Sequence, residues 1–211
     1  MNYVPVRNPV KKTKGSYPGY VPSQKMRRMI GVESTLERDL AILLEVDPDV
    51  DAYTEQPITI EYRLDDKWHS YTPDFAVQRI GLIKFVEVKP EWKALRPDNV
   101  RKFAAIRAVL AKSGRPFIVL TEKDIRRQPR LRNAELLHRG ARQGLPIEDL
   151  GAIFSELQSS TVPSVETLAL RMGGPDAINS IYSEITAGRL VADMSKPLVP
   201  GSKLSLAQKL H

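Results

Sequence analysis

The sequence predicts an α/β protein in which a mixed sheet is flanked by helices and is followed by a small, mainly helical domain. The main observation is the order of three segments. A mainly apolar segment over residues 82–88 is followed by an amphipathic pattern over 97–112 and by a second apolar segment over 116–120. This order is typical of a βαβ unit with two parallel strands. Alternating segments over 58–64 and 68–77 predict an antiparallel hairpin before it.

The composition is that of an ordinary globular protein, with 42% hydrophobic and 27% charged residues in a chain of 211. The absence of cysteine excludes disulfides and thiolate metal sites. No segment approaches the roughly 18 apolar residues of a membrane span, and the N-terminus lacks the apolar stretch of a signal peptide. We therefore expect a cytoplasmic protein without a membrane partner.

Residues 1–30 predict a basic, flexible arm. They contain four prolines, seven Lys or Arg residues and no acidic residue, and they show no apolar periodicity. Such a segment cannot bury enough apolar surface to fold alone, but it can lie along phosphates and become ordered on contact. The alternative is a solubilising tail. The candidate DNA contacts in this arm are Lys11, Lys12, Lys14, Arg27 and Arg28.

The first domain is expected over residues 31–144. Its first helix begins after Ser34, which is a good N-cap with Glu37 at the capping-box position, and it ends at Asp47-Pro48. Asp65-Asp66 forms the turn of the predicted hairpin. A basic helix over about 130–142 closes the domain before Gly144-Leu145-Pro146.

Residues 145–211 predict a second, winged-helix-like domain. Helical patterns over 147–158, 165–172 and 175–188 are followed by a strand or wing over 189–194. This part holds 5 Lys and Arg against 7 Asp and Glu, whereas residues 1–144 hold 27 against 18. The contrast favours DNA contact by the first part and a protein-docking or structural role for the second. Basic candidates on helices and linkers of the first part are Arg101, Lys102, Arg126, Arg127 and Arg130; their alternative role is to solvate helix faces.

Two carboxylates and a lysine stand among the predicted strands. Glu87 and Lys89 are two residues apart on one strand and therefore project on the same face, while Val86 and Val88 project on the other. If the neighbouring strand pairs with this one, Asp74 reaches the same edge. Two carboxylates suit Mg²⁺, which takes oxygen ligands together with water and phosphate oxygens.

Lys89 would then position or deprotonate an attacking water and offset the charge that develops on the phosphate. Glu37 would add a further ligand. Each residue alone also has a structural explanation, because Glu-x-Lys is often a surface ion pair, Pro-Asp a turn and Glu37 a helix cap.

The motifs resemble a known group of nucleases. Pro73-Asp74 with Glu87-Val88-Lys89 matches the PD-(D/E)xK pattern of restriction-endonuclease-like folds. The segments 34–38, 55–57 and 71–75 are similar to the TnsA endonuclease subunit of heteromeric transposases, and 181–198 is similar to the winged-helix C-terminal domain of that family.

The resemblance implies a specific function. TnsA-like proteins nick the 5′ strands at transposon ends with Mg²⁺, for which Mn²⁺ is expected to substitute. A DDE transposase (TnsB-like) cuts the 3′ strands, and an AAA+ ATPase (TnsC-like) is the regulator, all in the bacterial cytoplasm. By this likeness Glu37, Asp74, Glu87 and the backbone carbonyl of Val88 are metal ligands, and Lys89 is the catalytic lysine. Gln56 matches a recurrent glutamine that supports the active site.

Two alternatives remain open at the level of the sequence. The first is a stand-alone PD-(D/E)xK nuclease of restriction or repair type, which cuts duplex DNA without partners. The second is a non-catalytic DNA-binding assembly subunit, in which the arm and the basic helices do the binding.

Overall fold

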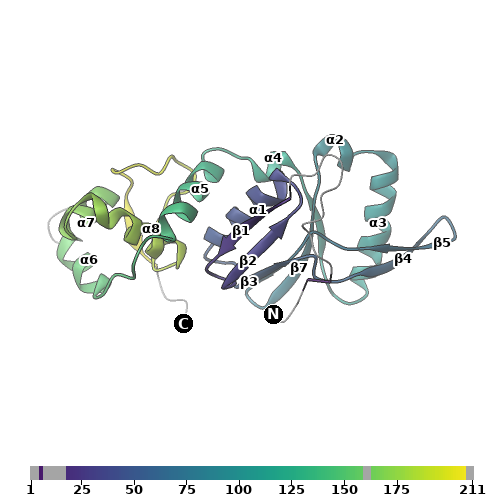
Figure 1. Cartoon of the computed structure of the whole chain (residues 1–211), viewed down its shortest axis with the longest axis horizontal. Coiled ribbons are helices and arrows are strands. Elements are labelled where there is room, and N and C mark those ends of the chain that lie inside the picture. The colour runs from purple at the N-terminus through teal and green to yellow at the C-terminus, as the bar shows by residue number, and fades with distance from the viewer. Residues whose placement is uncertain (1–4, 7–17, 159–162, 208–211) are drawn as a thin grey trace. The chain divides into compact units, whose positions relative to one another are not determined.

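The computed structural model describes residues 5–6, 18–158 and 163–207, which fold into two compact units. The first unit takes its described residues from 1–44 and 49–127, and the second from 45–48 and 128–211. Figure 1 shows the elements of both.

The first unit is built on a four-stranded sheet in the order β3-β6-β7-β8. β3 (Ala52–Glu55), β6 (Phe75–Arg79) and β7 (Leu82–Val88) are antiparallel neighbours, and β8 (Phe117–Leu120) lies parallel to β7. Helix α3 (Pro97–Ala111) connects the parallel pair. The predicted βαβ unit is therefore confirmed.

The strand that the sequence predicted over 68–77 is in fact two strands. β5 (Lys67–Tyr71) pairs with β4 (Ile60–Leu64) in a separate hairpin, whereas β6 starts at Phe75 and joins the main sheet. Pro73 lies in the interruption, and a proline cannot donate to a strand ladder. This break places Asp74, the residue after the proline, directly before the start of β6 at the edge of the main sheet.

A second hairpin corrects the prediction of an arm. β1 (Gly19–Ser23) pairs with β2 (Arg28–Val32), so residues 19–30 are folded. Both Arg28 terminal nitrogens donate to the buried carboxylate of Glu55 on β3, at 2.7 and 2.6 Å. The remaining arm candidates, Lys11, Lys12 and Lys14, lie outside the described residues.

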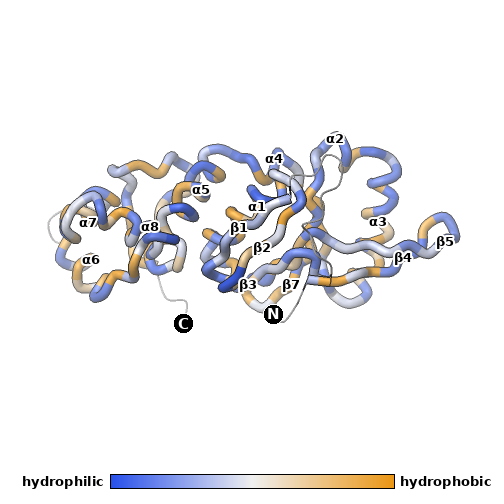
Figure 2. Tube along the Cα trace, in the orientation of Figure 1, coloured by the Kyte–Doolittle hydropathy of each residue, from blue (hydrophilic) through white to orange (hydrophobic). Residues whose placement is uncertain are grey.

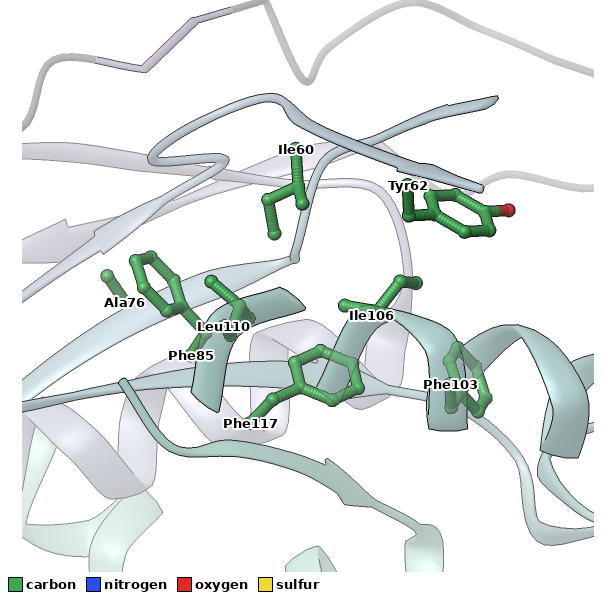
Figure 3. Packing of buried hydrophobic residues seen from close by; sticks show 8 residues of the cluster. All are labelled: Ile60, Tyr62, Ala76, Phe85, Phe103, Ile106, Leu110 and Phe117. Atoms are coloured by element: carbon green, nitrogen blue, oxygen red, sulfur yellow. The ribbon is translucent and has the colours of Figure 1, made fainter. Parts of the chain in front are cut away.

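Helices flank the main sheet, with α1 (Thr35–Val46) on the side opposite α3 (Figure 1). α3 buries Phe103, Ile106 and Leu110, which recur at helical spacing. In Figure 2 hydrophilic and hydrophobic stretches alternate along this helix, as expected for one apolar face. Figure 3 shows these side chains packed with residues of the sheet and of β4, namely Ile60, Tyr62, Ala76, Phe85 and Phe117.

The turn between β6 and β7 places a β-branched residue in an unfavourable backbone conformation. Its residues Ile80 and Gly81 both have left-handed backbones, with φ of 47° and 76°. This conformation suits glycine, but a β-branched residue such as Ile80 is strained in it. The side chain of Ile80 is 84% exposed, so packing gains do not account for its presence.

Two short helices follow the ends of the parallel strands. α2 (Glu91–Ala94) comes directly after β7, and α4 (Glu122–Ile125) comes directly after β8. The amide of Glu91 donates to Oε2 of Glu122 at 2.9 Å, so the two helices are tied together.

The second unit begins earlier than the sequence indicated. α5 (Arg130–Ala141) was expected to close the first domain, but it packs on α8 (Ile178–Thr186) within the second unit. A Cβ at Gly140 would lie 2.4 Å from a ring carbon of Tyr182, so the glycine permits this close approach. The boundary therefore lies near residue 128 instead of 144.

The rest of the second unit follows the predicted order of elements. α6 (Leu150–Gln158), which is mainly hydrophobic in Figure 2, and α7 (Val165–Arg171) precede a short 3₁₀ turn and α8. β9 (Leu190–Ala192) then pairs with β10 (Leu204–Leu206). Whether these helices and strands form a winged helix stays a prediction.

Over the part of the chain that the structure describes, no helix combines the length and the apolar character needed to cross a bilayer.

Candidate active site

Two carboxylates meet where β6 begins and β7 ends. The ladder pairs Phe75 with Val86, so Asp74, one residue earlier, falls opposite Glu87. Residues directly opposite each other in an antiparallel pair project on the same face of the sheet. The break at Pro73 and the register of β7 thus make Asp74 and Glu87 neighbours.

Glu87 is almost fully buried, with 2% of its surface exposed. Nζ of Lys89 lies 2.7 Å from its Oε1, and the hydroxyl of Tyr71 donates to its Oε2. These partners offset much of the cost of burying a charge. The sequence placed only Val86 and Val88 in the interior, but Glu87 is buried as well because Tyr71 packs beside it.

Asp74 is held by the backbones of its neighbours. Its Oδ2 accepts a hydrogen bond from the amide of Val88 at 2.7 Å, and its carbonyl oxygen accepts one from the amide of Gln56 at 2.8 Å. Gln56 is buried and has a left-handed backbone, and its side chain donates to Oε1 of Glu33 at 3.3 Å. Gln56 therefore positions the segment that carries Asp74.

Glu37 caps the first turn of α1. Its Oε2 accepts from the amide of Glu33 and its Oε1 accepts from the hydroxyl of Ser34, both at 2.8 Å. Ser34 Oγ in return accepts from the amide of Glu37 at 3.1 Å. The Ser34 half of the predicted capping box is therefore present, whereas Glu37 reaches back to the amide of Glu33, one residue before Ser34, instead of to that of Ser34 itself. Because the helix start borders the site, the same carboxylate also acts electrostatically on the acidic pair.

The acidic residues carry an excess of negative charge. Burial raises the pKa of Asp74, the nearby charges of Glu87 and Glu37 raise it further, and the Val88 amide and Lys89 offset only part of the effect. Burial also raises the pKa of Glu37, against the lowering effect of its capping bonds. A further positive charge is therefore favourable here.

The lysine of the site is held in its charged form. Burial by itself would lower the pKa of Lys89, but its ion pair with Glu87, aided by the other carboxylates, leaves that pKa raised. Lys102 on α3 behaves differently, because burial lowers its pKa and Lys89 adds repulsion. Nζ of Lys102 lies 5.2 Å from the centroid of the Tyr71 ring, so it borders the same group.

The acidic pair has the chemistry of a site for a divalent cation. Among the residues that the structure describes, no three His, Cys, Asp or Glu side chains form a metal-binding group. Glu37 as a third ligand stays a prediction. The donors at hand are the two carboxylates, whose oxygens are hard ligands, and the carbonyl of Val88 stays a predicted further donor. Mg²⁺ commonly takes one or two carboxylates and completes its shell with water and phosphate oxygens. The pair therefore fits Mg²⁺.

A cleft of about 490 Å³ lies next to the acidic pair; Lys89 and Val88 line it, whereas Asp74 and Glu87 do not. Its wall includes Glu37 and Lys89 from the group described above, Trp92 and Lys93 from α2, and Arg126 just after α4. Nε of Arg126 donates to Oδ2 of Asp39 at 2.7 Å. The cleft gives a substrate access to Lys89.

The basic candidates for DNA contact lie in different surroundings. Arg28 is bonded to buried Glu55, Arg101 pairs with Asp65, Arg127 with Asp124 and Arg130 with Asp47. Arg27 is exposed at the turn of the β1–β2 hairpin. Arg126 lines the cleft, and Lys102 borders the acidic pair. Arg28 thus has a structural role, because it neutralises a buried carboxylate.

Sequence reasoning missed Tyr71 and Trp92. The signal for Tyr71 is weak: it is a hydroxyl-bearing aromatic residue that ends a strand three positions before Asp74. Trp92 follows the Glu87-x-Lys89 motif closely, and this proximity in sequence is a signal that it lines the same cleft.

The fold and the site together define a class of protein, since a mixed sheet flanked by helices with an acidic pair and a lysine at one edge fits a nuclease fold. Residues 47–122 match the family model described as TnsA-like endonuclease N terminal. The matched segment includes β3 to β8 with Asp74, Glu87 and Lys89, and it confirms the resemblance to a TnsA-like nuclease. Among curated proteins, no relative matches this chain.

Proposed function

We propose that this chain is an Mg²⁺-dependent DNA endonuclease that nicks the 5′ strands at transposon ends, within a cut-and-paste transposase complex of the bacterial cytoplasm. The observation that supports this most strongly is the convergence of Asp74, Glu87 and Lys89 at one edge of a TnsA-like domain, beside a cleft.

In this proposal Asp74 and Glu87 hold the cation, and the Val88 carbonyl is a further donor. Mg²⁺ supplies Lewis-acid chemistry, because it polarises the scissile phosphate and stabilises the leaving oxygen. Tyr71 orients Glu87 through its hydroxyl, and Gln56 orients Asp74 through the backbone. Such outer partners fix the geometry of ligands.

Lys89 acts as a cation in the proposed reaction. In the metal-free protein the ion pair with Glu87 outweighs burial and raises its pKa, so Lys89 is there an ammonium group that donates hydrogen bonds. It therefore orients the attacking water and offsets negative charge on the phosphate, a role that preorganised charge fills well.

The partners follow from the family likeness and from charge. Residues 145–211 carry more acidic than basic residues, which disfavours phosphate contact and favours protein docking. We assign this region to contacts with a DDE transposase (TnsB-like) and an AAA+ ATPase (TnsC-like), and its winged-helix class belongs to the same proposal.

The test is strand-specific cleavage of an end-labelled transposon-end duplex with Mg²⁺ or Mn²⁺, with and without the co-encoded transposase. We expect cleavage of the 5′ strand by the wild type and strong loss in Asp74→Ala and Lys89→Ala. Matched controls are Asp66→Ala, at the exposed β4–β5 turn, and Lys84→Ala, exposed on β7.

Three outcomes discriminate the alternatives. Unchanged cleavage in Asp74→Ala and Lys89→Ala would overturn the assigned site. Efficient cleavage without any partner would favour a stand-alone nuclease. DNA binding without cleavage under any partner would favour the assembly subunit.

A further inference from the structure

One side chain of the cleft has no part in the chemistry derived above: the indole of Trp92. Trp92 lines the cleft together with Lys89, and 64% of its surface is exposed. A single exposed aromatic residue elsewhere on a protein needs no explanation. At the wall of a cleft that also holds the lysine of the site, a large flat apolar ring offers a substrate a surface for stacking.

The segment that carries the indole is held at both ends. The amide of Glu91 donates to Glu122, and the carboxylate of Glu91 lies 2.7 Å from Nζ of Lys123. After the ring in sequence, Nδ2 of Asn99 donates to the carbonyl oxygen of Lys93 at 2.6 Å. A ring on an ordered segment loses little conformational entropy on binding.

The cleft that Trp92 lines also holds cations. Nζ of Lys93 lies 5.2 Å from the centroid of the Trp92 ring. Arg126 on the same wall is fixed by Asp39 and by Thr35, whose Oγ1 accepts from its Nη2 at 3.0 Å. Together with Lys89 they outnumber the acidic residues that line the cleft, Glu37 and Glu122.

An aromatic platform flanked by fixed cations is the chemistry that binds single-stranded nucleic acid, in which bases stack on rings and phosphates meet Lys and Arg. An indole reaches the face of a base only when that base has left its neighbour in the duplex. The preferred ligand is therefore a nucleotide whose base is unstacked.

We propose that Trp92 is the stacking residue of a nucleotide subsite beside the catalytic group, with Lys93 and Arg126 as its phosphate contacts. The inference rests on the proposed nuclease function, because the bound nucleotide is one of the strand to be cut. It goes beyond that function, since it assigns to this chain a subsite for an unpaired nucleotide next to the cut.

The two tryptophans of the chain make the test direct. Trp68 lies on β5 with 73% of its surface exposed and does not line the cleft, whereas Trp92 does. In full-length Trp68→Phe the tryptophan fluorescence comes from Trp92 alone, and in Trp92→Phe it comes from Trp68 alone. Each variant is titrated in Ca²⁺ with a short single-stranded deoxyoligonucleotide, and anisotropy of a labelled copy reports binding independently.

Quenching is expected in Trp68→Phe and not in Trp92→Phe, because stacking on a base quenches only the ring that it covers. Trp92→Ala is expected to weaken binding of the oligonucleotide about tenfold, equivalent to about 1.4 kcal/mol. Trp92→Phe, which keeps a flat ring, should retain most of the affinity, and Trp68→Ala should match the wild type.

Binding without quenching of Trp92, equal affinity of Trp92→Ala and the wild type, or no binding at all would each overturn the subsite. The parent proposal fails separately, by unchanged 5′-strand cleavage in Asp74→Ala. Loss of quenching with Asp74-dependent cleavage intact therefore refutes the subsite alone.

Discussion

Asp74→Asn is expected to stabilise the metal-free protein while it abolishes cleavage. Burial, and after it repulsion by Glu87 and Glu37, holds the pKa of Asp74 well above the ordinary value of an aspartate. Asparagine has nearly the same shape and keeps an oxygen that accepts the hydrogen bond from the Val88 amide. The substitution therefore removes the repulsion and retains the contact.

The sign of the pH dependence follows from the direction of the pKa shift. Between the ordinary pKa of an aspartate and the raised pKa of Asp74, the folded state binds more protons than the unfolded state. The free energy of unfolding of the wild type therefore falls as pH rises through this window. Above the raised pKa, the folded state carries the full cost of holding the Asp74 carboxylate charged. The Asp74→Asn variant carries no such cost, so its advantage over the wild type should shrink as pH falls.

The expected gain in the free energy of unfolding of Asp74→Asn is modest, because a single stabilising substitution commonly contributes about 0.5–2 kcal/mol. For a chain of this size each kcal/mol raises Tm by about 2–4 °C. A cation at ten times its Kd should add about 1.4 kcal/mol to the wild type and little to the variant.

The assay is thermal unfolding in EDTA at neutral and acidic pH, followed by titration with Mg²⁺, with Asp66→Asn at the exposed turn as the control. A variant less stable than the wild type at neutral pH, or an advantage that does not shrink in acid, would refute the electrostatic reasoning. Equal stabilisation of both proteins by Mg²⁺ would refute the assignment of the ligand.

Three further predictions concern single residues. Tyr71→Phe removes the hydroxyl that orients Glu87 and should lower kcat about 10- to 100-fold at unchanged KM, as measured by single-turnover and steady-state cleavage. Arg28→Ala leaves buried Glu55 without its guanidinium and should cost roughly 2–3 kcal/mol in urea unfolding, somewhat less than a fully buried pair because Arg28 is partly exposed; an unchanged midpoint would contradict this. Ile80→Asn replaces a strained left-handed isoleucine with a residue favoured in such turns and should raise stability by about 1 kcal/mol, with lower stability as the opposing result.

The βαβ unit was predictable because its signals are local. Residues 82–88 are mainly apolar despite Lys84 and Glu87, residues 116–120 are a short apolar segment, and the helix between them has both a proline start and an apolar stripe. Each of these features acts within a few residues along the chain. The parallel pairing of the two strands then follows from the connection between them.

The folded hairpin and the unit boundary were not predictable, because they depend on contacts between residues that are far apart in the sequence. β1–β2 is joined to the sheet by the pair of Arg28 with Glu55, which lies 27 positions further along the chain. α5 has an ordinary amphipathic pattern, and its partner is Tyr182 on a helix far later in the sequence. Local periodicity carries no information about which surface such a helix covers.

The site was predictable in part. The spacing of Glu87 and Lys89 places them on one face, and the pairing of β6 with β7 adds Asp74. The burial of Glu87 was missed because it depends on Tyr71, whose strand ends just before the break at Pro73.

The most direct test of the central claim is Mg²⁺-dependent cleavage of the 5′ strand at a transposon end by the assembled complex, compared between the wild type and Asp74→Ala. The proposed function predicts cleavage by the wild type and none above background by the variant, with DNA binding retained in both. Equal cleavage by the two proteins would contradict the assignment of Asp74, Glu87 and Lys89 as the site of the reaction.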